Sequence, residues 1–143
     1  MHFLHAPGAS ANQLNVWIPD MAVFFCGDVI SSEFPRLYSI GEFPRDATSW
    51  IKSLDRIRRL KPTVLIPSRG GVVTETSDIR DLVTNHRDAI QFVHDQTIRL
   101  ANAGHHRDVI SRALELPSQL FSSGRLPKPH DPIDWSVKAV YDR

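Results

Sequence analysis

Cysteine is almost absent from this chain, since Cys26 is the single one among 143 residues. One cysteine excludes an intramolecular disulfide and a cysteine-rich zinc site. Cys26 ends an apolar run over residues 21–26. We therefore expect a buried thiol that packs in the core, rather than a catalytic nucleophile.

An excess of charge of one sign is also missing. The 17 basic residues nearly balance the 16 acidic ones, which leaves a net charge of +1. Without a broad basic surface, nucleic-acid binding is not expected. No apolar run approaches the roughly 18–20 residues that span a bilayer, so no membrane segment is expected either. The composition, with 41% hydrophobic and 23% charged residues, is typical of a globular protein.

The first five residues lack the charged region and apolar core of a secretory signal. We therefore take a cytoplasmic location as the default. Residues 1–5 are typical of a strand that begins inside a domain, so we expect a further half-domain upstream. The length suits one domain, or a half-domain plus a smaller module.

The first part of the chain has an α/β pattern. Alternating apolar residues followed by Pro19-Asp20 predict a β-hairpin that ends at Gly27-Asp28. Asp46 is a good N-cap for a helix that Lys61-Pro62 ends. Residues 64–66 are then predicted as a short buried strand, and residues 67–71 as a tight turn. The apolar residues of the expected helix are Trp50, Ile51, Leu54, Ile57 and Leu60.

The second part is predicted to be all-helical. Ser77 is the expected cap of a long helix, and Gly104 is its natural stop. A second helix is expected to end at Leu116-Pro117, and a last amphipathic one covers residues 134–141. The apolar stripe of the long helix is Ile79, Leu82, Val83, His86, Ile90, Val93, Thr97, Ile98 and Ala101. We place the boundary between the two parts at residues 76 and 77.

Four groups of segments together resemble one family, the alkyl sulfatases of the metallo-β-lactamase superfamily. The segments are residues 5–8 with 13–20, residues 25–28, residues 45–62 leading into 65–68, and residues 87–97 with 135–142. The resemblance covers nearly the whole chain. It implies an α/β fold in which residues 1–76 are the carboxy-terminal part of an αββα sandwich. Residues 77–143 are then the start of an all-α dimerisation-type domain.

The resemblance also implies an activity. Members of the family are zinc-dependent hydrolases that cleave linear alkyl sulfate esters, such as dodecyl sulfate, to an alcohol and sulfate. Two zinc ions, held by several histidines and carboxylates, activate a water molecule by lowering its pKa. In the family, the helical region joins two subunits, which implies a homodimer or association with a full-length relative through the helical tail.

Departures from the family pattern fall on the metal ligands. The superfamily's His-x-His-x-Asp-His motif is missing from the sequence, and an arginine expected near residues 40–42 is not evident. Ala9 stands where the family has a glutamate ligand, and Arg69 where it has a histidine. Asp28 keeps the bridging carboxylate, but Val29 replaces the usual asparagine beside it. Asp28 is therefore the single retained candidate for a metal ligand, no catalytic residue is assigned, and we expect this chain alone to bind no zinc.

Most candidate residues also have a simpler interpretation. Asp28 is equally a turn residue that caps the loop after the hairpin. Arg69 is either an anion contact, helped by the amides of Gly70-Gly71, or a surface arginine. His105-His106 is more typical of the start of a solvated helix than of a metal site.

Three functions follow from these patterns. The first is a fragment or degenerate copy of an alkyl sulfatase that is inactive alone. The second is a non-catalytic dimerisation module, because the stripe of the long helix is wider than a lone helix needs. The third, an active enzyme with relocated ligands, has no replacement set of ligands in the sequence. Half of a sandwich would also expose a sheet edge and an apolar face, which favours marginal stability or association.

Overall fold

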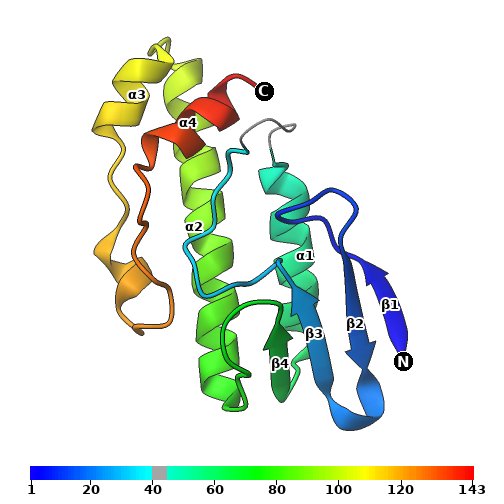
Figure 1. The fold of residues 1–143 in the computed structure, drawn as a ribbon. Helices are drawn as coiled ribbons and strands as arrows, with labels where there is room; N and C mark the ends of the chain where they lie inside the picture. Colours follow the sequence, from blue (N-terminus) through cyan, green and yellow to red (C-terminus); the bar gives the residue numbers. More distant parts are fainter. Residues whose placement is uncertain (40–44) are drawn as a thin grey trace.

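A computed structural model describes residues 1–39 and 45–143 of the chain (Figure 1). The fold is mixed α/β, as the sequence predicts. Residues 40–42, where an arginine was expected, lie outside the described residues. The elements in chain order are β1 (His2–His5), β2 (Leu14–Ile18), the 3-10 turn η1 (Pro19–Met21), β3 (Val23–Gly27), α1 (Ala47–Leu60), β4 (Val64–Pro67), α2 (Thr76–Asn102), α3 (Arg107–Ala113), the 3-10 turn η2 (Ser118–Phe121) and α4 (Asp134–Tyr141).

The four strands form one sheet in the order β1-β2-β3-β4. The predicted hairpin is confirmed, because β2 and β3 pair antiparallel with Val16 opposite Phe25. Residues 2–5 form the strand β1, which pairs antiparallel with β2, so the strand predicted there is confirmed. β3 and β4 run parallel, and α1 is the crossover that parallel strands require.

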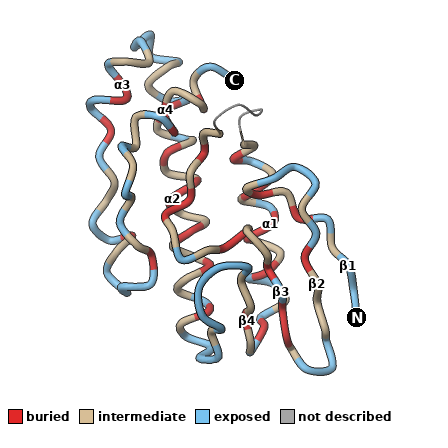
Figure 2. The backbone as a smooth tube through the Cα atoms, viewed as in Figure 1, coloured by how far each residue is buried: buried red, intermediate tan, exposed pale blue. Residues whose placement is uncertain are grey.

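The two faces of the sheet differ in burial. One face packs under the helices, and its residues Phe24, Cys26 and Leu65 are buried. The alternate residues Phe3 and Leu14 are 65% and 59% exposed. The apolar face that the sequence predicts is therefore present, and no described helix covers it (Figure 2).

Helix α1 forms as predicted and ties the sheet to its loops. Asp46 caps it by accepting a hydrogen bond from the Thr48 amide at 3.0 Å. Its buried face includes Trp50, Leu54 and Ile57. The Trp50 indole donates to the Val29 carbonyl at 2.9 Å, which fixes the loop after β3 against the helix.

Helix α2 begins slightly earlier than predicted. Glu75 takes the extended cap conformation, so Ser77 lies in the first turn and is not the cap. The helix ends at Asn102, and Gly104 follows with a φ of +87°, which a side chain would strain. The prediction for α3 was too long: Leu114 is extended, so the helix stops at Ala113.

The apolar stripe of α2 is consumed within the chain. Ile79, Val83 and Val93 are buried, and α2 contacts α1, η2, α3 and α4. Most of the stripe is therefore core, Ile98 from the expected stripe is exposed, and association through the helical tail stays a prediction. One core cluster joins Phe24 of the sheet to residues of α2, α3 and α4, so packing continues across residue 76. The division at residues 76 and 77 stays a prediction.

Candidate functional site

Two parallel strands end at the candidate site. Since β3 and β4 are parallel, the residues that follow them meet at the same edge of the sheet. Gly27 closes β3 with a φ of +54°, and a methyl group there would come within 2.5 Å of the Gln13 side chain. The Ser68 amide donates to the Gly27 carbonyl at 3.0 Å, and the Ser68 hydroxyl donates to Asp28. Asp28 is thus held in place by the end of the neighbouring strand.

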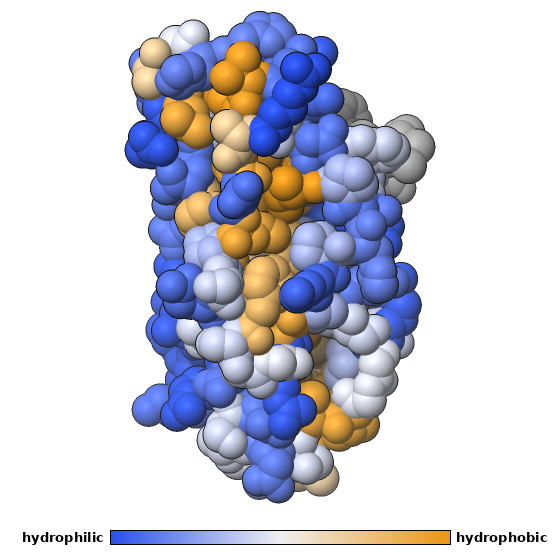
Figure 3. Space-filling view, turned by 90° about the vertical axis from the view of Figure 1, so that its left-hand side faces the viewer, coloured by the Kyte–Doolittle hydropathy of each residue, from blue (hydrophilic) through white to orange (hydrophobic). Residues whose placement is uncertain are grey.

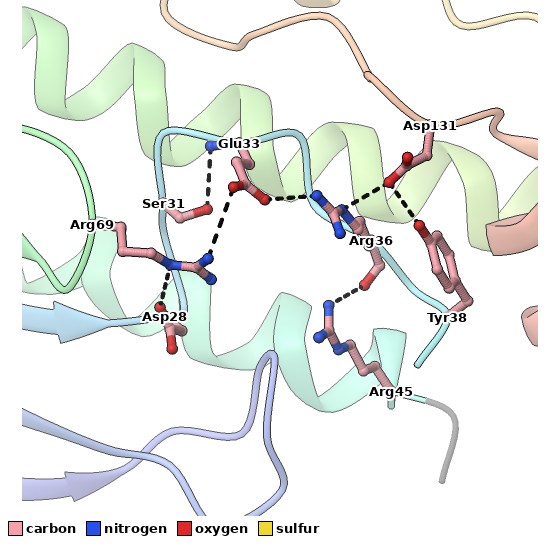
Figure 4. Close-up of polar contacts among 8 residues, drawn as sticks. All are labelled: Asp28, Ser31, Glu33, Arg36, Tyr38, Arg45, Arg69 and Asp131. Carbon is pink, nitrogen blue, oxygen red and sulfur yellow. Dashed lines mark hydrogen bonds and ion pairs between the residues drawn. The ribbon is translucent and has the colours of Figure 1, made fainter. Parts of the chain in front are cut away.

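Arg69 lies directly beside Asp28 (Figure 4). Its Nε is 3.4 Å from Asp28 Oδ1, and its Nη1 is 3.8 Å from Glu33 Oε1. The Arg69 and Asp28 side chains are 60% and 43% exposed. The residue that replaces the family's histidine therefore places a guanidinium against the retained carboxylate.

The ion pairs continue along the loop after β3. Glu33 pairs with Arg36 at 2.9 Å, and Arg36 Nε lies 3.1 Å from Asp131. Tyr38 donates to the same Asp131 carboxylate at 2.7 Å, and Arg45 donates to the Arg36 carbonyl at 2.9 Å. Figure 4 shows these groups as one line of alternating charges. The line fastens the loop to a residue more than ninety positions further along the chain.

Sequence reasoning missed this line of charges. The Glu33 and Arg36 pair could have been found from its spacing of three residues. Asp131 has no local signal, because its partners Arg36 and Tyr38 are distant in the sequence. Burial raises the pKa of Tyr38, and the hydrogen bond with Asp131 raises it further. Tyr38 is therefore a neutral donor at neutral pH and is not poised as a base.

His86 on α2 packs against the loop after β3. It is 1% exposed, and its Nδ1 lies 3.0 Å from the Leu82 carbonyl in the preceding turn of α2. The backbone of Ser31 and Glu33 lies against its ring. Burial lowers the pKa of His86, so the side chain is neutral. His86 is thus a packed, hydrogen-bonded member of the apolar stripe on which the sequence places it.

Ala9 belongs to the loop between β1 and β2, which reaches the same edge of the sheet. A methyl group on Gly8 would lie 3.1 Å from the Val29 side chain and 3.2 Å from the Trp50 indole nitrogen. Ala9 packs against the main core, and Val29 is fully buried. The structure thus gathers the predicted positions at one edge, where Ala9 and Val29 serve packing.

Three further histidines have hydrogen-bond partners of their own. His5 hydrogen-bonds the Ala11 carbonyl at 2.9 Å, and His94 lies 2.8 Å from Asp95 on α2. His106 caps α3 by accepting from the Asp108 amide at 3.4 Å, as the sequence predicted for a helix start. Among residues 1–39 and 45–143, no group of three or more His, Cys, Asp and Glu side chains could hold a metal ion.

The donor set at this edge does not fit the two zinc ions that the family implies. Zinc sites in proteins need three or four ligand atoms from His, Cys, Asp or Glu. Here Asp28 is engaged by a hydroxyl and a guanidinium, and the carboxylates of Glu33 and Asp131 are paired with arginines. The arrangement can hold loops in place, and within residues 1–39 and 45–143 it offers no ligand cluster.

Comparisons with known proteins agree with the fold. Residues 1–69 match the Metallo-beta-lactamase superfamily. The chain is 28% identical over 144 residues to a linear primary-alkylsulfatase of Pseudomonas sp., covering 99% of this chain and 27% of that protein. It is 30% identical over 146 residues to the alkyl/aryl-sulfatase BDS1 of Saccharomyces cerevisiae, covering 99% and 23%. The chain spans about a quarter of the length of these relatives.

The solved structure of the stereoselective inverting sec-alkylsulfatase Pisa1 from Pseudomonas sp. superimposes with a TM-score of 0.88. The match covers 99% of this chain and 23% of that one at 22% identity, so the likeness concerns the fold. None of the described helices has the length and apolar character needed to cross a membrane. Along nearly its whole length the chain is thus similar in sequence to alkylsulfatases, and residues 1–69 match the Metallo-beta-lactamase superfamily.

Proposed function

We propose that this chain is a degenerate alkylsulfatase scaffold that, alone, neither holds two zinc ions nor hydrolyses alkyl sulfates. One observation carries the proposal: the Arg69 guanidinium lies 3.4 Å from Asp28, the one retained carboxylate. The relatives whose names record sulfatase activity are about four times longer. Residues outside this segment would have to supply most of their metal ligands.

The physical argument is electrostatic. A guanidinium is a permanent cation at any pH of interest, so deprotonation cannot clear it from the site. A divalent ion about 5 Å from that cation is repelled by roughly 2 kcal/mol even at the dielectric constant of water. Asp28 Oδ1 already accepts a hydrogen bond from the Ser68 hydroxyl, which lowers its availability to a metal ion. Both effects oppose metal binding at Asp28.

Elemental analysis after dialysis against zinc tests the proposal. We expect well below one equivalent of zinc per chain, and no release of sulfate from dodecyl sulfate. Two bound equivalents together with hydrolysis would contradict the proposal directly.

A matched pair of variants sharpens this test. The double variant Ala9→Glu/Arg69→His replaces the cation and adds two donor groups at the edge that already holds Asp28. The control Arg69→Met removes the cation and adds no donor. We expect measurable zinc binding by the double variant and none by the control. If the double variant and the control contained the same amount of zinc, the two added donor groups would be wrongly placed for a metal ion. The Arg69 cation would then not be the only obstacle to binding.

A second candidate function is self-association through the helical tail, as a homodimer or with a longer relative. Val109 on α3 and Trp135 on α4 are exposed. An open hollow of about 570 Å³ has Leu114, Leu116, Phe121 and Ile133 among its lining residues. Figure 3 shows an apolar band down the side of the molecule that carries α3 and the segment after it. Such a band supports an interface in place of the buried stripe of α2.

Sedimentation velocity over a hundredfold range of concentration checks this second function. We expect a dimer that Leu116→Glu, in the apolar hollow, dissociates. The control Leu14→Glu changes an exposed residue on the sheet and should leave the dimer intact. A monomer at all concentrations, or dissociation by Leu14→Glu alone, counts against an interface on the helical tail.

A further inference from the structure

A hollow of about 520 Å³ lies where the end of α1 meets the start of α2. Ile57, Ile79 and Val83 form an apolar floor, and each is almost fully buried. Pro62 and Thr76 complete the wall between the two helices. The volume falls within the roughly 300–1,000 Å³ typical of pockets that bind small molecules.

This hollow is remote from the candidate site. Asp28 and Arg69 follow the carboxyl ends of β3 and β4, whereas Lys61 comes three residues before the first residue of β4. The four-residue strand β4 alone separates the two edges by about 13 Å. In Figure 1 the end of α1 and the start of α2 lie at the same lower end of the molecule. The hollow therefore belongs to the opposite edge of the fold.

Positive charge surrounds the apolar floor. Four cations line the hollow against one carboxylate, Asp55. Asp55 is shared between Arg58 at 3.3 Å and Arg87 at 2.9 Å, and Arg80 pairs with Asp81 at 3.2 Å. The remaining two cations, Arg59 and Lys61, have no ion pair within the described part of the chain.

We propose that this hollow binds a single-chain anionic amphiphile, a class that includes fatty carboxylates and alkyl sulfates. The alkyl chain would lie on Ile57, Ile79 and Val83, and the head group would contact Arg59 and Lys61. Burial of methylenes supplies affinity, and the exposed cations supply selectivity for charge. Long cationic side chains can cover apolar surface with their stems while they hold an anion at their ends. A neutral or cationic amphiphile would contact the apolar floor but would leave Arg59 and Lys61 without an anionic partner.

Titration with ligands of equal chain length tests the charge requirement. Decanoate, decyl sulfate and decyltrimethylammonium, each below its micellar concentration, would be followed by amide chemical shifts. We expect both anions to shift residues 57–62 and 76–83, and the cation to bind at least ~10-fold more weakly. A preference for decanoate would identify a fatty-carboxylate site and a preference for decyl sulfate an alkyl-sulfate site. Equal binding of the cation, or shifts confined to the exposed sheet face, would overturn the proposal.

Chain length provides an independent measure. Each added methylene that the floor buries should raise affinity by about fourfold. From octanoate to decanoate we therefore expect a gain of at least ~10-fold. An affinity that does not change with chain length would show that the head group binds alone and would refute the assignment of the floor.

Two matched variants locate the ligand. Arg59→Glu/Lys61→Glu reverses the unpaired rim cations, while Lys52→Glu/Arg112→Glu makes the same change in net charge at exposed positions outside the hollow. We expect a loss of affinity of ~10-fold or more in the first and less than twofold in the second.

Steric blocking complements the charge reversal. Thr76→Trp fills the mouth of the hollow, and Thr74→Trp is its exposed control outside the lining. Circular dichroism confirms that each variant folds. Equal losses in a variant and its control would exclude this hollow as the site. Zinc content does not enter any of these measurements, so they stand or fall independently of the proposed function.

Discussion

The two edges of the sheet manage charge in opposite ways. At the carboxyl ends of β3 and β4, Arg69 and Arg36 each have carboxylate partners within 3.8 Å. At the other edge, Arg59 and Lys61 lie around an apolar floor, and neither has an ion-pair partner among the residues that the structure describes. Paired charges fasten loops to one another, whereas unpaired charges beside apolar surface are available to a ligand.

The contrast differs from what the resemblance to the alkyl sulfatases implies. At the edge where that resemblance predicts metal ligands, the Arg69 guanidinium lies beside Asp28. The hollow with room for a ligand lies between two helices that the family resemblance treats as scaffold. In this chain, the edge where the resemblance predicts a metal site and the hollow with room for a ligand therefore lie at different places.

The largest expected effect tests whether both edges depend on the same core. Leu54 is fully buried in the middle of α1, between the loop after β3 and the hollow. We expect Leu54→Ala to lower the free energy of unfolding by about 2–5 kcal/mol, because a buried cavity replaces the side chain. Urea denaturation followed by tryptophan fluorescence measures this loss. Lys52→Ala, at an exposed position on the same helix, should stay within about 0.5 kcal/mol. A loss of less than about 0.5 kcal/mol for Leu54→Ala would mean that the two edges do not share a core.

The two edges should respond differently to a fall in pH. Burial lowers the pKa of His86, which underlies the loop at the charged edge, below its ordinary value of 6.5. The folded protein therefore keeps His86 neutral while the unfolded chain takes up a proton below pH 6.5. Stability should consequently fall as pH drops from 7 to 5, by at most about 1.4 kcal/mol per pH unit. Urea midpoints of the protein and of His86→Leu at several pH values give the slope.

In that comparison, His86→Leu should flatten the dependence on pH, and the exposed His105→Leu should not. Binding of decyl sulfate at the hollow should change little over the same range, since its head group stays ionised and the rim is built from arginine and lysine. An unchanged slope in His86→Leu would assign the acid sensitivity to other groups.

The smallest effect concerns the charged edge itself. Asp28 and Arg69 are each well exposed, so a double-mutant cycle of Asp28→Asn and Arg69→Gln should give a coupling energy of about 0.2–1 kcal/mol. The coupling should shrink in 1 M salt, because exposed charges are screened. A coupling above about 2 kcal/mol would indicate that the pair carries much more of the loop's stability than its exposure suggests.

Local patterns predicted most of the elements. The alternation over Leu14, Val16 and Ile18, the cap at Asp46 and the limits of α4 all recur in the structure. The errors fell at helix ends: Ser77 and Leu116 were read as boundaries. The local backbone at Glu75 and Leu114 fixes those boundaries, and no side-chain signal marks them.

Features that depend on residues far apart in the sequence could not be predicted from it. Asp131 meets Tyr38 and Arg36 because α4 and the segment before it fold back over α2, and no spacing encodes that return. The hollow likewise needs the end of α1 and the start of α2, which the sequence predicts as two separate helices. By contrast, the substitutions at Ala9 and Arg69 were visible in advance, because a family pattern supplied the expected residue at each position.

Cys26 can serve as a chemical probe of the seam, the line of pairing between β3 and β4. Its thiol is fully buried with Sγ 3.6 Å from the Ile66 carbonyl on the neighbouring strand, and burial raises its pKa to about 12. A thiol-modifying reagent therefore reacts only when the seam opens and water reaches the sulfur. Since the chain has no other cysteine, the rate of modification reports how often these two strands part.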